Sequence, residues 1–100
     1  MTLFETGPII MTPGIRELIS EGPYELDIVQ RCLERHTEGD WGQLCDDDRQ
    51  LNQDSLKEEK EKGFTYRNLF SSYDTELGRI YIITECDRSV TTILTPSEYR

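Results

Sequence analysis

The chain has 100 residues, of which 20 are acidic and 11 basic, and its formal net charge is −9. This length predicts one domain with a small core, which excludes a multidomain enzyme or a deep cleft between domains. Phosphate contacts need clustered Lys or Arg, and the sequence has no such cluster, so we expect no direct binding of nucleic acid.

Cysteine usage and hydropathy indicate the compartment. The three cysteines, Cys32, Cys45 and Cys86, are odd in number and form no Cys-x-x-Cys pair, so neither a disulfide scaffold nor a zinc ribbon is expected. No apolar run reaches the length that crosses a bilayer, and residues 1–5 contain no basic segment followed by an apolar one. We therefore expect a cytoplasmic protein with reduced thiols, no cofactor, no metal and no membrane contact.

The first half of the sequence predicts helices. Ile9-Ile10-Met11 favours an edge strand, and Thr12-Pro13 then predicts a helix start with Thr12 as the N-cap. A second helix is expected over residues 23–36, because apolar residues recur there at helical spacing. A third, thinly apolar helix is expected over residues 46–61, lying on the surface.

The second half predicts strands. The segments 66–73, 79–85 and 90–95 are rich in β-branched and aromatic residues and are separated by short turns. Two hairpins in series give a meander. We therefore predict a single α+β domain over residues 1–100, with N-terminal helices packed on one face of a three- or four-stranded antiparallel meander.

Three groups of residues could carry chemistry. His36 and Asp40 stand four apart and could form a general base, although the favoured interpretation of His36 is a histidine that caps a helix end. The run of three aspartates at positions 46–48 could hold a hard cation or could cap the third helix. The polar turn around Glu85, Asp87 and Arg88, in which Arg88 could pair with either carboxylate, could perform acid–base work, or it could lock the hairpin by bonding turn N–H groups.

A single tryptophan lies in the loop of residues 38–42, between two glycines. Trp41 is large enough to anchor that loop in the core, with its indole N–H needing an acceptor, or it could stack on a ligand. The candidate catalytic residues are therefore His36, Asp40, Glu85, Asp87 and Arg88. The candidate binding residues are Trp41, Asp46, Asp47, Asp48 and Arg88.

A combination of polar strings runs through most of residues 10–99. The strings are His36 with Gly39-Asp40-Trp41-Gly42, Asp48 and Asn52, Ser71-Ser72-Tyr73, Ile82-Ile83-Thr84-Glu85-x-Asp87-Arg88-Ser89-x-Thr91-Thr92, and Pro96-x-Glu98-Tyr99. Together they resemble a family of short bacterial proteins, often carried on plasmids or other mobile elements. The resemblance implies a bacterial mobile-element protein and no particular activity.

Three hypotheses follow. The acidic surface and the lack of a catalytic motif favour an interaction protein whose partner is a basic, nucleic-acid-handling protein such as a host defence nuclease; the same charge also serves solubility. The second is a small metal-assisted hydrolase that uses His36 and Asp40 with Glu85 and Asp87. The third is a homodimeric structural module that pairs through an exposed sheet edge.

Overall fold

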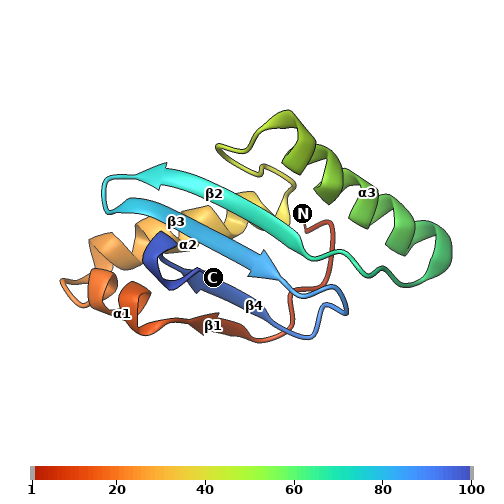
Figure 1. The fold of residues 1–100 in the computed structure, drawn as a ribbon. Coiled ribbons are helices and arrows are strands. Elements are labelled where there is room, and N and C mark those ends of the chain that lie inside the picture. Colours follow the sequence, from red (N-terminus) through yellow and green to blue (C-terminus); the bar gives the residue numbers. More distant parts are fainter. Residues whose placement is uncertain (1, 100) are drawn as a thin grey trace.

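The computed structural model describes residues 2–99 (Figure 1). In chain order the elements are β1 (Ile9–Met11), α1 (Pro13–Ile19), α2 (Pro23–Thr37), α3 (Asp46–Lys62), β2 (Leu69–Thr75), β3 (Gly78–Thr84), β4 (Thr91–Leu94) and a 3-10 turn, η1 (Pro96–Glu98). The described chain is thus an α+β fold with three α-helices and one four-stranded sheet.

The sheet is mixed, and its strand order is β1-β4-β3-β2. Strands β2, β3 and β4 form the expected antiparallel meander, but β1 lies parallel to β4, so the expectation of a purely antiparallel sheet is wrong. The N–H of Thr91 donates to the Pro8 carbonyl at 3.0 Å, and the N–H of Thr12 donates to the Ile93 carbonyl at 3.1 Å. Because these two strands are about 80 residues apart, local pattern carries no information on their relative direction.

The helices begin and end close to their predicted bounds. Pro13 and Pro23 both occupy the first turn of their helices, where a missing N–H costs nothing. Thr12 is the N-cap residue of α1 as predicted, but its side chain does not bond a helix N–H. Its hydroxyl instead donates to the Glu98 carboxylate at 2.6 Å. The same carboxylate accepts the N–H of Gly14 at 3.0 Å, so Glu98 from η1 performs the capping.

The main core lies between α1, α2 and one face of the sheet. Strand alternation turns Ile80 and Ile82 of β3 toward the helices, where they are fully buried. The buried members of this cluster are Ile15, Val29, Cys32, Tyr73, Ile80, Ile82 and Ile93. A second, smaller cluster of Phe4, Trp41 and Leu69 extends the core beneath the loop that precedes α3.

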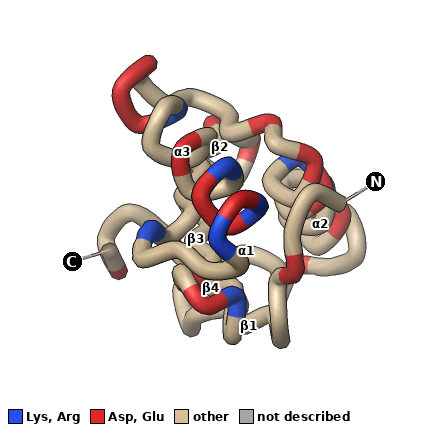
Figure 2. Tube along the Cα trace, turned by 90° about the vertical axis from the view of Figure 1, so that its right-hand side faces the viewer, with Lys and Arg blue, Asp and Glu red and all other residues tan. Residues whose placement is uncertain are grey.

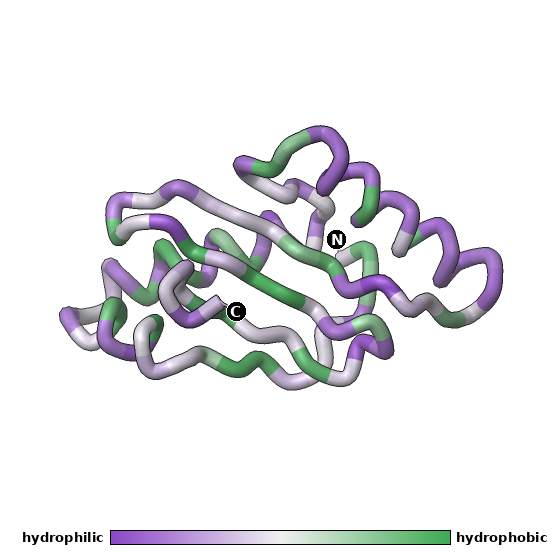
Figure 3. The backbone as a smooth tube through the Cα atoms, in the orientation of Figure 1, coloured by the Kyte–Doolittle hydropathy of each residue, from purple (hydrophilic) through white to green (hydrophobic). Residues whose placement is uncertain are grey.

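Helix α3 lies beside the β2 edge of the sheet and is hydrophilic along most of its length (Figure 3). The side-chain amide of Asn52 donates to the Phe70 carbonyl at 2.7 Å and accepts the Phe70 N–H at 3.1 Å, as a neighbouring strand would. Further along β2, Ser72 exchanges backbone hydrogen bonds with Trp41 and Gln43 at 3.1 and 2.7 Å. These contacts occupy the outward backbone groups of β2 and protect that edge against strand addition.

Candidate functional site

His36 lies inside the protein and does not cap a helix end. The last turn of α2 directs the ring toward the sheet, and the residue has no exposed surface. Its Nδ1 atom is hydrogen-bonded to the Ser71 hydroxyl of β2, and its Nε2 atom lies 2.9 Å from the Thr84 hydroxyl of β3. The expectation of a capping histidine is therefore wrong, because α2 packs its C-terminal turn onto the sheet.

The hydrogen bonds beyond Thr84 fix which ring nitrogen carries the proton. The Thr91 hydroxyl donates to the carbonyl of Thr6 at 2.8 Å, and a carbonyl can only accept. Thr84 must then donate its one hydroxyl proton to Thr91, at 2.8 Å. His36 consequently donates from Nε2–H to Thr84 and accepts the Ser71 proton at Nδ1.

The surroundings of His36 keep the ring neutral. The rings of Phe4 and Trp41 stand edge-on to the imidazole, with centroids 5.3 and 5.7 Å away. Burial lowers the pKa of His36 to about 3, and the positive charge of Arg88 adds to this shift. A general base must reach a substrate proton, and here both ring nitrogens are bonded to hydroxyls and the residue has no exposed surface. The geometry therefore gives His36 a structural role.

Arg88 is also buried, with 7% of its surface exposed, and it adopts a left-handed backbone conformation with φ of 60°. Its guanidinium donates to the Ser55 hydroxyl at 3.0 Å, and its Nε atom lies 3.2 Å from a carboxylate oxygen of Glu59. The sequence led us to expect a pairing with Glu85 or Asp87, but the partner carboxylate comes from α3. Arg88 thereby joins α3 to the β3–β4 turn.

Two of the remaining candidate acids, Asp40 and Asp87, make local side-chain contacts, whereas Glu85 takes part in the β3–β4 turn through its backbone N–H and carbonyl. Asp40 pairs with Arg35 at 2.7 Å, and this hydrogen bond lowers the pKa of the Asp40 carboxyl. Asp87 accepts the N–H of Ser89 at 3.0 Å, which is the turn-locking role that the sequence allowed. Within residues 2–99, no group of three or more His, Cys, Asp or Glu residues is arranged to hold a metal ion. Of the candidate catalytic residues, Arg88 lies near enough to His36 to act on its pKa, whereas Asp40 and Asp87 are engaged by Arg35 and Ser89.

The candidate binding residues divide by exposure. Trp41 is 2% exposed, so its ring anchors the loop, and its indole N–H finds no acceptor among the described residues. Asp46, Asp47 and Asp48 form the exposed first turn of α3, where negative charge complements the helix dipole. Of this set, only the three aspartates are available to a partner.

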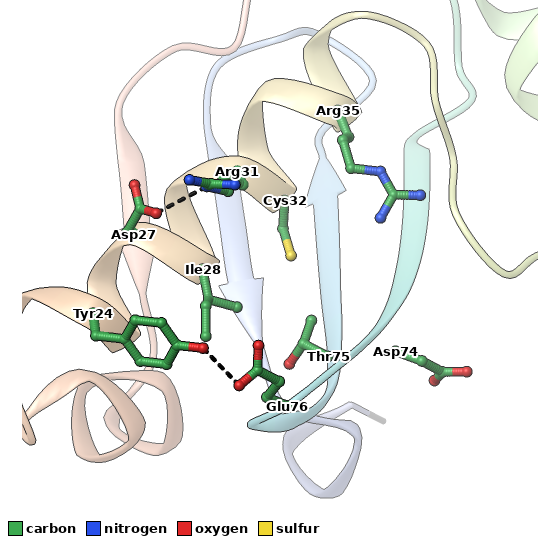
Figure 4. A pocket seen from close by; sticks show the side chains of 9 residues that line it. All are labelled: Tyr24, Asp27, Ile28, Arg31, Cys32, Arg35, Asp74, Thr75 and Glu76. Carbon is green, nitrogen blue, oxygen red and sulfur yellow. Dashed lines mark hydrogen bonds and ion pairs between the residues drawn. The ribbon is translucent and has the colours of Figure 1, made fainter.

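A surface groove of about 460 Å³ lies between α2 and the β2–β3 turn (Figure 4). Its charged groups are already engaged: Arg31 pairs with Asp27 at 2.8 Å, and the Tyr24 hydroxyl donates to Glu76 at 2.6 Å. Cys32 lies within the groove, and burial raises the pKa of its thiol. The charged side chains of this groove are therefore paired with one another, and the raised pKa of the Cys32 thiol disfavours the reactive thiolate.

The sequence reasoning missed the residues that complete these networks. Ser55 and Glu59 lie on a helix that reads as solvent-exposed, and Ser71 and Thr91 are small polar residues in strands. Their positions in the strands could have indicated them. Ser71, Thr84 and Thr91 each lie two residues from a buried apolar residue of the same strand, and therefore on the same, buried face of the sheet. A polar residue on the buried face of a strand must find a partner there.

Fold and site together define a small α+β domain with a mixed four-stranded sheet, a buried polar network and an acidic surface. No family model matches the chain, and no match was found among curated proteins or among solved structures. None of the helices described over residues 2–99 combines the length and the apolar character that crossing a membrane requires.

Proposed function

We propose that this protein is a small acidic interaction protein that binds the basic surface of another protein. The observation that carries the proposal is how the positive charges are used. Most of the Lys and Arg side chains form ion pairs or hydrogen bonds within the protein. The carboxylates that outnumber them are left without a cationic partner among the described residues and face outward.

Ion pairs within residues 2–99 hold Arg31, Arg35, Lys57, Lys62, Arg79 and Arg88. Arg16 and Arg49 instead donate to backbone carbonyls. In contrast, the carboxylates of Asp46, Asp47 and Asp48 form no ion pair or side-chain hydrogen bond with another described residue. Figure 2 shows acidic residues spread around the fold in that view. Such a surface favours encounter with a positively charged partner.

The resemblance to plasmid-borne bacterial proteins suggests the setting. In a bacterial cytoplasm, a mobile element benefits from blocking host nucleases, and the nucleic-acid-binding surface of a nuclease is basic. An acidic domain of this size would compete with DNA or RNA for that surface. We therefore propose a nucleic-acid-handling protein, such as a host defence nuclease, as the partner.

The test is affinity capture from bacterial lysate at low salt and at about 0.5 M salt, followed by mass spectrometry. We expect a basic partner that high salt displaces, since screening weakens exposed charge pairs. A variant with Asp46→Asn, Asp47→Asn and Asp48→Asn should bind about 3- to 160-fold more weakly, from about 0.2–1 kcal/mol per exposed pair. Replacing the same residues by Glu keeps the charge and should retain binding. Capture of only salt-resistant or acidic partners would refute the proposal.

A homodimer is the second candidate, and one observation favours it. The β2 edge is covered by α3 and its preceding loop, whereas β1 is the other edge strand and exposes Ile9 and Ile10 by 40% and 48%. An apolar sheet edge is a site for strand addition. Light scattering over a range of concentrations measures the mass; a value that stays at 11.7 kDa rules the dimer out.

A further inference from the structure

The sheet face opposite α1 and α2 carries a groove of about 360 Å³ that none of the roles above uses. Helix α3 forms one side and the C-terminal segment the other. The groove is lined by Asp48, Leu51, Asn52, Asn68, Phe70, Tyr81 and Tyr99, and we call it the aromatic groove. Figure 1 shows the C-terminal segment lying over the sheet, on the side away from α2.

Three aromatic rings form the floor and one wall of the aromatic groove. The ring centroids of Phe70 and Tyr81 are 5.0 Å apart, and Tyr99 lies 5.6 Å from each of them. Tyr99 is 51% exposed, and Leu51 across the groove is 46% exposed. Rings that pack together yet remain open to water are typical of an interaction surface.

The charge at the rim selects the partner. Asp48 lines the groove directly, and Asp46 and Asp47 precede it in the same helical turn. The adjacent Arg49 does not neutralise them, because its guanidinium donates to the carbonyls of Gly42 and Leu44 at 2.6 and 3.0 Å. The floor thus offers partly exposed aromatic rings, while the rim offers carboxylates that form no ion pair with another described residue.

The guanidinium of an arginine matches both features. It stacks on aromatic faces through cation–π attraction and also forms paired hydrogen bonds with a carboxylate, which the compact ammonium of lysine does less well. A second copy of this chain would bring the same negative charge to the rim and would be repelled.

We propose that the aromatic groove is the docking site for an arginine on a basic segment of the partner protein. The side chain lies against Tyr99 and Tyr81, and its guanidinium faces Asp48. This inference rests on the proposed function and names the surface through which it acts.

The first experiment uses an NMR titration of the full chain with the peptide Gly-Arg-Gly-Arg-Gly-Arg-Gly, blocked at both ends. The matched probe replaces each Arg by Lys. We expect amide shifts concentrated at Leu51, Asn68, Phe70 and Tyr81, and about two- to fivefold tighter binding of the arginine peptide, the ratio given by about 0.5–1 kcal/mol of cation–π attraction. Shifts spread over all acidic surfaces, or equal affinity for both peptides, would overturn the proposal.

The second experiment uses variants. Tyr99→Ala should weaken binding of the arginine peptide about two- to fivefold through the loss of the cation–π contact, and Asp48→Asn should weaken it about 1.4- to fivefold through the loss of one exposed ion pair. Tyr66→Ala removes a ring that is 85% exposed and lies outside the groove, so it should leave binding unchanged. Full binding by both groove variants would refute the site.

The two proposals fail differently. If the captured partner is basic and displaced by salt but binds the Tyr99→Ala and Asp48→Asn variants as tightly as the parent, the groove is wrong and the acidic interaction protein stands. If groove resonances shift with protein concentration alone, the occupant is a second copy, which overturns the arginine assignment.

Discussion

Lowering the pH from 7 to 5 should destabilise this protein through one residue, His36. In the folded chain the ring is neutral, donates from Nε2 and has its pKa lowered to about 3 by burial, whereas an exposed histidine titrates near 6.5. Below about pH 6.5, His36 therefore binds a proton in the unfolded state but not in the folded state. Stability is complete above that pH and declines as the pH falls, until the folded ring titrates near 3.

The magnitude follows from linkage. One proton bound only by the unfolded state costs about 1.4 kcal/mol of stability per pH unit. Between pH 6.5 and pH 5 the free energy of unfolding should thus fall by about 2 kcal/mol. Carboxylates contribute below this window, because Asp40 and Asp74 have pKa values already lowered by their arginine partners.

Urea unfolding at pH 7, 6 and 5 measures this loss, with the fluorescence of the buried Trp41 as the signal. Since the chain has a single histidine, its ring Cε1–H resonance provides an independent check in the folded protein. We expect that resonance to stay constant down to at least pH 4.5. A ring that titrates near pH 6.5, or stability that is flat from pH 7 to pH 5, would refute the neutral, fully bonded histidine.

Three substitutions test other parts of the structure. Thr84→Val keeps the shape but breaks the hydroxyl chain, so it should cost about 1–3 kcal/mol in urea unfolding, whereas Thr92→Val on the opposite sheet face should cost far less. Gly42→Ala would place a Cβ 2.0 Å from the Ser72 carbonyl oxygen, so it should cost about 3 kcal/mol or more, against about 1 kcal/mol for Gly63→Ala, which meets nothing within 4 Å. Glu98→Gln should speed hydrogen exchange at the Gly14 and Thr95 amides; unchanged protection would show that the carboxylate does not hold α1 to η1.

Local patterns predicted the parts of the fold that local forces determine. The prolines at positions 13 and 23 start helices, and the β-branched run of residues 79–85 marks the central strand, because propensity and capping act within a few residues. The parallel pairing of Ile9–Met11 with β4 escaped prediction. It depends on where the chain returns after three helices and two strands, which no local pattern encodes.

The candidate site was predicted in composition but not in arrangement. His36 and Arg88 were singled out, yet their partners come from distant segments: Ser71 for His36 and Glu59 for Arg88. The sequence also left Phe70, Tyr81 and Tyr99 unconnected. Strand register and the return of the C-terminal segment over the sheet bring these rings together, and both are tertiary features.

The interaction hypothesis is tested most directly by the dissociation constant for the purified partner, measured against salt concentration from about 50 to 500 mM. An acidic surface bound to a basic one predicts an affinity that falls steadily as salt rises, with a shallower dependence when Asp46, Asp47 and Asp48 are replaced by Asn. An affinity that is independent of salt, or that increases with it, would contradict a charge-driven interaction.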